Sequence, residues 1–260
     1  KQGEQADRAL PFLKIALETN PNQGQFWVSY IDTLIHLGKL DAARNVLEQG
    51  YSRGLKGDEV DQLEERLNSH QKNQSGLAQV KVDSVIALYS QGQIQEALDA
   101  SEALIKDYPN NFLLYNINGA CCTRLGQLDD AVKRYEQVLA IKPDYADAHN
   151  NLAATLHDLG QLESAVKCYE QALAIKPDYV DAHYNLGITY KALGQLEEAV
   201  KHYEQALAIK PDYAEVHYNL GATLQELGQL DAAVKRYEQA LAIKPDYAEA
   251  HYNLGNTLKE

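Results

Sequence analysis

Residues 145–178 read YADAHNNLAATLHDLGQLESAVKCYEQALAIKPD, and residues 213–246 read YAEVHYNLGATLQELGQLDAAVKRYEQALAIKPD. The two stretches are versions of one 34-residue unit that recurs in phase through the C-terminal half of the chain. The period is marked by Gly126, Gly160, Gly194 and Gly228, by Ala131, Ala165, Ala199 and Ala233, and by Pro143, Pro177, Pro211 and Pro245. A fixed period of this length predicts a solenoid in which each repeat packs against its neighbours.

We number each unit from place 1 to place 34, with units starting at Phe112, Ala146, Val180, Ala214 and Ala248. Apolar or packing residues fall at places 4, 7, 8, 11 and 14, and again at 17, 20, 24, 27 and 28. These are two helical stripes, separated by the Gly at place 15 and ended by the Pro at place 32. Each unit is therefore predicted to form two antiparallel helices of about 14 residues.

The residues that follow each Pro are expected to start the next helix. Asp144, Asp178, Asp212 and Asp246 stand where a helix N-cap belongs. An acid follows three residues later, which is close to a capping box. Inside the helices, Gly187, Gly221 and Gly255 at place 8 predict a close approach, and the tyrosines at place 24 fill the space beside them. These tyrosines are Tyr135, Tyr169, Tyr203 and Tyr237.

This pattern resembles the tetratricopeptide repeat family. The unit from Val180 supplies the family's residues at the expected places, namely His183, Leu186, Gly187, Tyr190, Ala199, Tyr203, Ala206 and Pro211. The resemblance implies an all-α fold, a right-handed α-α superhelix of antiparallel helix pairs. The array is similar to the tetratricopeptide arm of bacterial-type O-linked N-acetylglucosamine transferases.

The repeat phase breaks once and divides the chain. We expect an N-terminal lobe over 1–57, an inserted helix with a polar connector over 58–77, and a main array over 78–260 with five full repeats and a truncated first helix. Pro11 is expected to interrupt or kink the first helix. The chain starts at Lys1, contains no Met and stops inside a unit, so we expect a fragment of a longer protein.

The side of each first helix opposite its buried stripe carries places 2, 6, 9 and 13. By resemblance, this side lines a concave groove. Its candidate peptide-binding residues are Asn151, Asn185, Asn219 and Asn253 at place 6, Asp147, Asp181, Glu215 and Glu249 at place 2, and Tyr184, Tyr218 and Tyr252 at place 5. An Asn side chain can pair with both the N–H and the C=O of a peptide. The row of Asn residues at place 6, which we call the Asn ladder, therefore either binds an extended backbone or only solvates the groove. The acids either prefer basic segments or only serve the helix N-termini.

The formal net charge of −13 argues against nucleic-acid or anionic-membrane binding, and favours neutral to basic polypeptide partners. Cys121, Cys122 and Cys168 form no disulfide framework, which fits a reducing, cytoplasmic location. One His per repeat, about 10 Å from the next, does not assemble a metal site, so these residues are expected to pack. We expect no metal, no cofactor and no catalytic site.

The sequence thus favours a protein-protein interaction scaffold that takes an extended peptide or a partner helix. Two alternatives remain open. In the first, the chain is the substrate-recognition arm of a larger enzyme, such as a glycosyltransferase, sulfotransferase or methyltransferase. In the second, it is a structural scaffold that associates end to end through Leu254 and Leu258.

Overall fold

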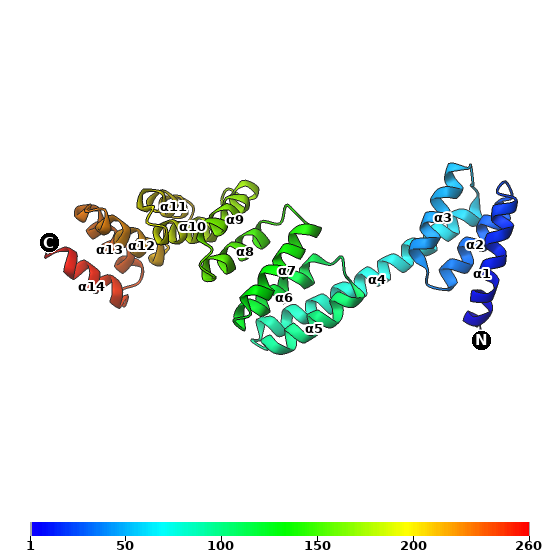
Figure 1. Cartoon of the computed structure of the whole chain (residues 1–260), viewed down its shortest axis with the longest axis horizontal. Coiled ribbons are helices and arrows are strands. Elements are labelled where there is room, and N and C mark those ends of the chain that lie inside the picture. The colour runs from blue at the N-terminus through cyan, green and yellow to red at the C-terminus, as the bar shows by residue number, and fades with distance from the viewer. Residues whose placement is uncertain (1, 260) are drawn as a thin grey trace. The chain divides into compact units, whose positions relative to one another are not determined.

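The computed structural model describes the backbone of residues 2–259, and the side chains of residues 5–69 and 79–259. Every regular element over that range is an α-helix (Figure 1). The chain divides into two compact units, residues 1–81 and 82–260, and each is described by itself.

The second unit is a succession of helix pairs with the predicted 34-residue period. Its helices are α5 (Ile94–Asp107), α6 (Phe112–Arg124), α7 (Leu128–Ile141), α8 (Ala146–Asp158), α9 (Leu162–Ile175), α10 (Val180–Ala192), α11 (Leu196–Ile209), α12 (Ala214–Glu226), α13 (Leu230–Ile243) and α14 (Ala248–Thr257). The Gly at place 15 turns the chain between the two helices of a pair, as at Gly194, where φ is +73°. An all-α superhelix is thereby confirmed.

The first and second helices of the pairs occupy opposite sides of this unit. The backbones of consecutive first helices, such as α10 and α12, approach within 8 Å between Cα atoms, whereas those of consecutive second helices do not within the described residues. A solenoid is narrower on the side where its helices approach each other. The first helices therefore line the inner side and the second helices the outer side.

The predicted N-caps are wrong by one residue. The caps are Tyr145, Tyr179 and their equivalents rather than the Asp before them, and these tyrosines make no capping hydrogen bond with their side chains. The helix starts later because the Tyr ring is used for packing against the preceding repeat. The acid at place 2, such as Asp181, lies in the first turn, where the helix dipole favours it.

Close packing at place 8 is confirmed for Gly187 and Gly221 but is wrong for Gly255, where nothing in the described residues lies within 4 Å of an added Cβ. A Cβ at Gly187 would lie 2.6 Å from Cε1 of Tyr203, and a Cβ at Gly221 would lie 2.9 Å from Cδ1 of Tyr237. Real side chains do not approach so closely, so a side chain at these two glycines would require the facing Tyr ring to shift. Both tyrosines are fully buried. The unit from Ala146 accommodates Ala153 at place 8 with Tyr169 at place 24.

The first unit contains α1 (Gln2–Thr19), α2 (Gly24–His36), α3 (Leu40–Ser52) and the beginning of α4 (Asp58–Ser90). Val60, Leu63 and Leu67 of α4 are buried in one cluster with Trp27 and Ile31 of α2. The residues inserted into the repeat pattern therefore complete the core of this unit.

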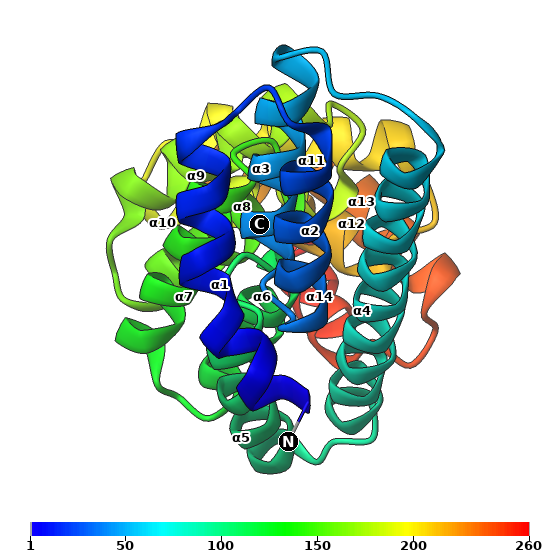
Figure 2. The same ribbon diagram turned by 90° about the vertical axis from the view of Figure 1, so that its right-hand side faces the viewer.

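One expectation about the N-terminal region is wrong, and another holds at most in part. Residues 71–76, expected to be a polar connector, belong to α4, which runs unbroken as a single helix (Figure 2). The segment is polar but contains no Pro, and one Gly inside a helix costs only about 1 kcal/mol. Pro11 lies inside α1 without ending it. The carbonyl group that loses its partner is that of Asp7, an exposed residue that water can reach.

Candidate binding face of the repeat array

The Asn residues at place 6 are tied to the preceding repeat. Nδ2 of Asn219 donates to the hydroxyl of Tyr184 at 2.9 Å, and Nδ2 of Asn253 donates to that of Tyr218 at 3.2 Å. Each bond joins neighbouring first helices, on the inner side. The structure therefore brings together two of the predicted sets of residues, the Asn at place 6 and the Tyr at place 5.

The rings of these tyrosines are held between repeats. Tyr184 lies 5.3 Å from Tyr213, and Tyr218 lies 5.0 Å from Tyr247, measured between ring centroids. The place-5 rings of Tyr184 and Tyr218 are half-buried, whereas the place-5 ring of Tyr252 in α14 is 71% exposed. Aromatic contacts of this kind stabilise the packing of one repeat on the next.

The ladder changes towards the N-terminal end of the array. Asn116 and Asn150 replace Tyr at place 5, and the Oδ1 atom of each is buried without a hydrogen-bond partner among the described residues. Nδ2 of Asn150 lies 3.4 Å from Oδ1 of Asn151. For Asn185, at place 6 of the next unit, the described residues supply no side-chain hydrogen bond. The face is therefore aromatic in its C-terminal repeats and rich in amides before them.

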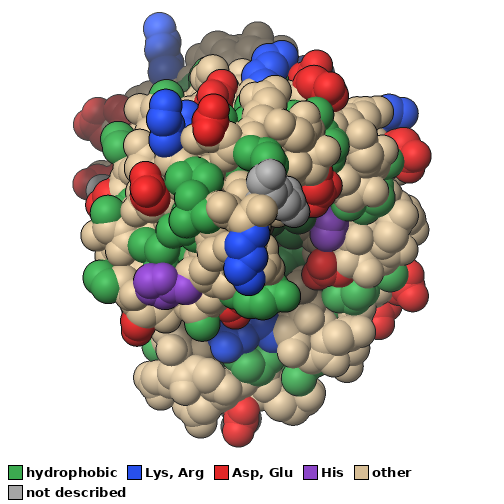
Figure 3. All heavy atoms as spheres, turned by 90° about the vertical axis from the view of Figure 1, so that its left-hand side faces the viewer, with side chains coloured by type: hydrophobic (Ala, Val, Ile, Leu, Met, Phe, Trp, Pro, Cys, Tyr) green, Lys and Arg blue, Asp and Glu red, His purple; other side chains and the backbone are tan. Residues whose placement is uncertain are grey.

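The acids at place 2 are partly committed to neighbours. Glu215 lies 3.8 Å from Nζ of Lys244, and burial together with a hydrogen bond to Asp147 raises the pKa of Tyr179. At place 13, Glu226 pairs with Lys191 at 2.6 Å. The acidic character predicted for this face is thus reduced. On the C-terminal end of the chain, acidic and basic side chains are scattered among hydrophobic ones (Figure 3).

The His at place 4 has a role that the sequence did not indicate. In four repeats its Nε2 atom lies 2.9–3.0 Å from the carbonyl oxygen of the Pro six residues before it, at His149, His183, His217 and His251. Nε1 of Trp27 makes the same bond to Pro21 at 2.8 Å. A ring N–H at place 4 therefore ties the start of each of these helices to the loop before it. The constant spacing from Pro to an N–H donor was the available signal.

Nothing in the described residues suggests catalysis. Among them no group of three or more His, Cys, Asp or Glu side chains could hold a metal ion. Burial raises the pKa of Cys121 to about 11 and also raises that of Cys168, so both are protonated thiols at neutral pH. No helix in the described part of the chain is both long and apolar enough to cross a membrane.

The repeats match known repeats in sequence. The family described as TPR repeat matches residues 119–160, 154–194, 189–228 and 224–260, which together span more than half of the chain. The chain belongs to the tetratricopeptide repeat family. Tetratricopeptide repeats are also matched at residues 2–67 and 85–111, so the N-terminal unit is built from the same repeat.

Solved tetratricopeptide structures share the fold. PilW, described as a widely conserved type IV pilus biogenesis factor, is 22% identical with a TM-score of 0.65, covering 70% of this chain and 86% of PilW. YrrB, a TPR protein with an unusual peptide-binding site, is 20% identical with a TM-score of 0.57, covering 66% and 89%. A thermophilic TPR protein of Thermus thermophilus, TTC0263, is 24% identical with a TM-score of 0.56, covering 70% and 100%. No curated protein is significantly similar in sequence.

Proposed function

We propose that this tetratricopeptide chain is a protein-interaction scaffold, and that the inner face of its array binds an extended peptide. The observation that carries the proposal is the Asn–Tyr ladder along the first helices. It places hydrogen-bonding groups at a regular interval on one side of the array. The solved structure of YrrB, described as having a peptide-binding site, supports the same use of the fold.

The ladder retains enough hydrogen-bonding capacity to bind a peptide backbone. Asn219 uses one N–H for Tyr184, which leaves its second N–H and its Oδ1. The phenol of Tyr184 accepts that bond and keeps its own O–H as a donor. A peptide C=O and N–H therefore find complementary partners at the two Asn–Tyr pairs, Asn219–Tyr184 and Asn253–Tyr218.

The spacing of the ladder favours an extended ligand. Packed helices lie about 10 Å apart, and an extended chain advances about 3.3 Å per residue. One place-6 Asn, or rung of the ladder, then meets every third residue of the peptide. Of the place-2 acids, Asp181 and Glu249 are exposed, and the chain carries a net charge of −13, so neutral to basic peptides are favoured.

A peptide library tests this proposal. The variant Asn185→Ala/Asn219→Ala/Asn253→Ala removes three rungs, and we expect it to weaken binding of extended, neutral to basic peptides at least tenfold. The matched control is Gln171→Ala/Gln205→Ala/Gln239→Ala, which removes three exposed amides from the second helices. Equal binding by wild type and the Asn variant, with both folded by circular dichroism, would show that the ladder is structural.

A second variant separates ligand contact from repeat packing. Tyr184→Phe/Tyr218→Phe keeps the ring contacts but removes the hydroxyls that anchor Asn219 and Asn253. If the ladder binds the peptide, this variant stays folded and loses affinity. Unchanged affinity in this variant would mean that the anchored Asn geometry is irrelevant to binding.

A further inference from the structure

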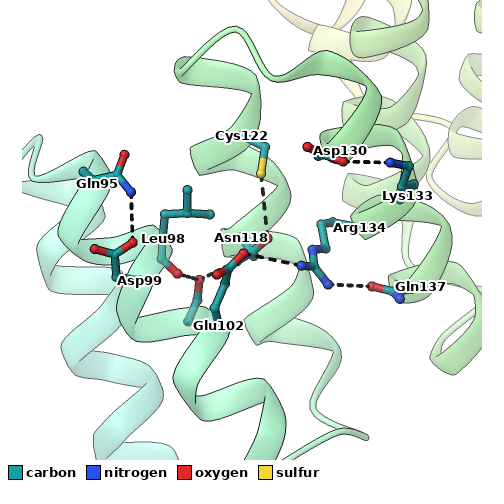
Figure 4. A network of polar contacts seen from close by, with 11 residues as sticks. Gln95, Leu98, Asp99, Glu102, Asn118, Cys122, Asp130, Lys133, Arg134 and Gln137 are labelled. Atoms are coloured by element: carbon teal, nitrogen blue, oxygen red, sulfur yellow. Dashed lines mark hydrogen bonds and ion pairs between the residues drawn. The ribbon is translucent and has the colours of Figure 1, made fainter.

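The outer side of the array carries a repeated ion pair between second helices. Arg134 of α7 lies 3.5 Å from Glu102 of α5, and Arg236 of α13 lies 3.7 Å from Glu204 of α11. In each case an Arg at place 23 reaches the Glu at place 25 of the preceding unit (Figure 4). We call the line along which two consecutive second helices meet a seam. Both Arg side chains are more than two-thirds buried, so they fill the seams between α5 and α7 and between α11 and α13.

The seam between α9 and α11 has the Glu but not the Arg. Glu170 occupies place 25, and His202 occupies place 23. An open surface hollow of about 690 Å³ lies at this seam. Its walls include Glu170, Leu173, His183, Tyr190, Glu198 and His202. Lys201 also reaches this hollow, but its Nζ lies 3.5 Å from Glu198.

The hydrogen bonds of the His pair determine what the hollow offers. Nε2 of His183 must donate to the carbonyl of Pro177, so its Nδ1 accepts from Nδ1–H of His202, 3.2 Å away. Nε2 of neutral His202 is then a free acceptor. Burial lowers the pKa of His202 to about 4, so the ring carries no positive charge at neutral pH.

Tyr190 completes the site and distinguishes it from the other seams. Its hydroxyl donates to Oε1 of Glu170 at 3.3 Å, and its ring stacks with that of His202 at 5.5 Å between centroids. Place 11 is Cys122, Leu156 or Leu224 in the neighbouring units, so only this one carries an aromatic ring there. The hollow thus combines a carboxylate, a neutral imidazole and an aromatic ring.

We propose that this hollow binds the arginine side chain of a partner polypeptide. A guanidinium group is planar, donates five hydrogen bonds and stacks on aromatic rings, which matches the groups around the hollow. The same interaction occurs within the chain at the α5–α7 and α11–α13 seams, where Arg134 and Arg236 occupy place 23. At the α7–α9 seam, place 23 is Cys168. The negative charge of the chain favours the approach of such a partner.

The corresponding hollow of the N-terminal unit lacks this chemistry. A hollow of about 390 Å³ beside Trp27 is lined by Lys14 and Val46, which stand where Glu170 and His202 stand in the array. Its rim also carries Arg53. Glu18 also lines this hollow, but its carboxylate lies 3.7 Å from Nζ of Lys14. The place-25 carboxylate and the imidazole acceptor have no counterpart there, so the proposal applies to the array only.

NMR titration of the full chain with N-acetyl-arginine amide tests the site. We expect saturable shifts of the His202 and Tyr190 ring signals, and at least fivefold weaker binding of the lysine analogue. Glu170→Gln should weaken binding at least fivefold. His202→Arg should abolish it, because a built-in guanidinium then occupies the seam.

The control is Glu204→Gln, which removes the equivalent carboxylate from a seam already filled by Arg236. Binding unchanged in this control, but lost in His202→Arg, supports the site. Binding that persists in His202→Arg, equal affinity for the lysine analogue, or no saturable shift at the two rings would each overturn it. The inner-face ladder is untouched by these variants, so the outcome is independent of the peptide-binding proposal.

Discussion

The N-terminal unit and the main array solve the same packing problem in opposite ways. In the array, Gly187 at place 8 faces Tyr203 at place 24. In the N-terminal unit the same two places hold Ile31 and Leu47, and both are buried. One region pairs the smallest residue with a large ring, and the other pairs two medium-sized aliphatic chains. A larger residue at place 8 thus goes with a smaller one at place 24, so the two places vary together.

The repeat over 78–111 adopts a third combination. Val85 stands at place 8 and Ser101 at place 24, and both are fully buried. The smaller place-24 residue is polar, and Nδ2 of Asn118 donates to its hydroxyl at 2.8 Å (Figure 4). Asn118 in turn occupies place 7, which is Leu in the regular units. Two departures from the repeat pattern thus satisfy each other.

The largest expected effect comes from removing the ring. Tyr203→Ala should destabilise the array by about 3–5 kcal/mol, because it leaves a cavity beside Gly187 that the backbone cannot fill. Urea denaturation followed by circular dichroism measures this. The matched control is Tyr252→Ala, whose ring is 71% exposed. It should change stability by no more than about 0.5 kcal/mol.

A transplant of the N-terminal pair sharpens the comparison. Gly187→Ile alone should cost about 1–3 kcal/mol or more, because its Cβ would overlap the Tyr203 ring. The double variant Gly187→Ile/Tyr203→Leu recreates Ile31 and Leu47 in the array, and we expect it to recover much of that loss. If the double variant is less stable than the sum of the two single changes predicts, the two places do not compensate for each other.

The polar pair should cost less to break than the packed ring. Ser101→Ala leaves the buried amide of Asn118 without its acceptor, at about 1–3 kcal/mol. Ser101→Ala/Asn118→Leu removes both polar partners and should be nearly neutral. A double-mutant cycle read by thermal unfolding checks this, and additive effects of the two changes would contradict the coupling.

A pH dependence of stability is also expected in the array. The pKa of His202 is about 4 in the folded chain and about 6.5 when unfolded. As pH falls from 6.5 towards 4, the unfolded chain binds a proton that the folded chain does not, so stability decreases. Above pH 7 this contribution is constant. His202→Val imitates Val46 of the N-terminal unit and should flatten the profile; an unchanged profile would assign the dependence to other groups.

Most of the structural features that the sequence predicts follow from its 34-residue period. Helix pairs, the turn at Gly194 and the contact between Gly187 and Tyr203 all follow from periodicity, because each is repeated several times in the sequence. The bond from Asn219 to Tyr184 did not follow, because it joins residues of different repeats whose relative rotation the sequence does not state. The sequence does not predict that α4 continues through its polar segment, because a polar composition is also typical of loops.

The bond from Trp27 to Pro21 has a practical consequence. The chain contains one Trp and 17 Tyr, and the indole of Trp27 is buried in the core of the N-terminal unit. Its fluorescence therefore reports on that unit alone, while far-ultraviolet dichroism is dominated by the longer array. Following both signals through one denaturation curve shows whether the two units unfold together, without any label or further substitution.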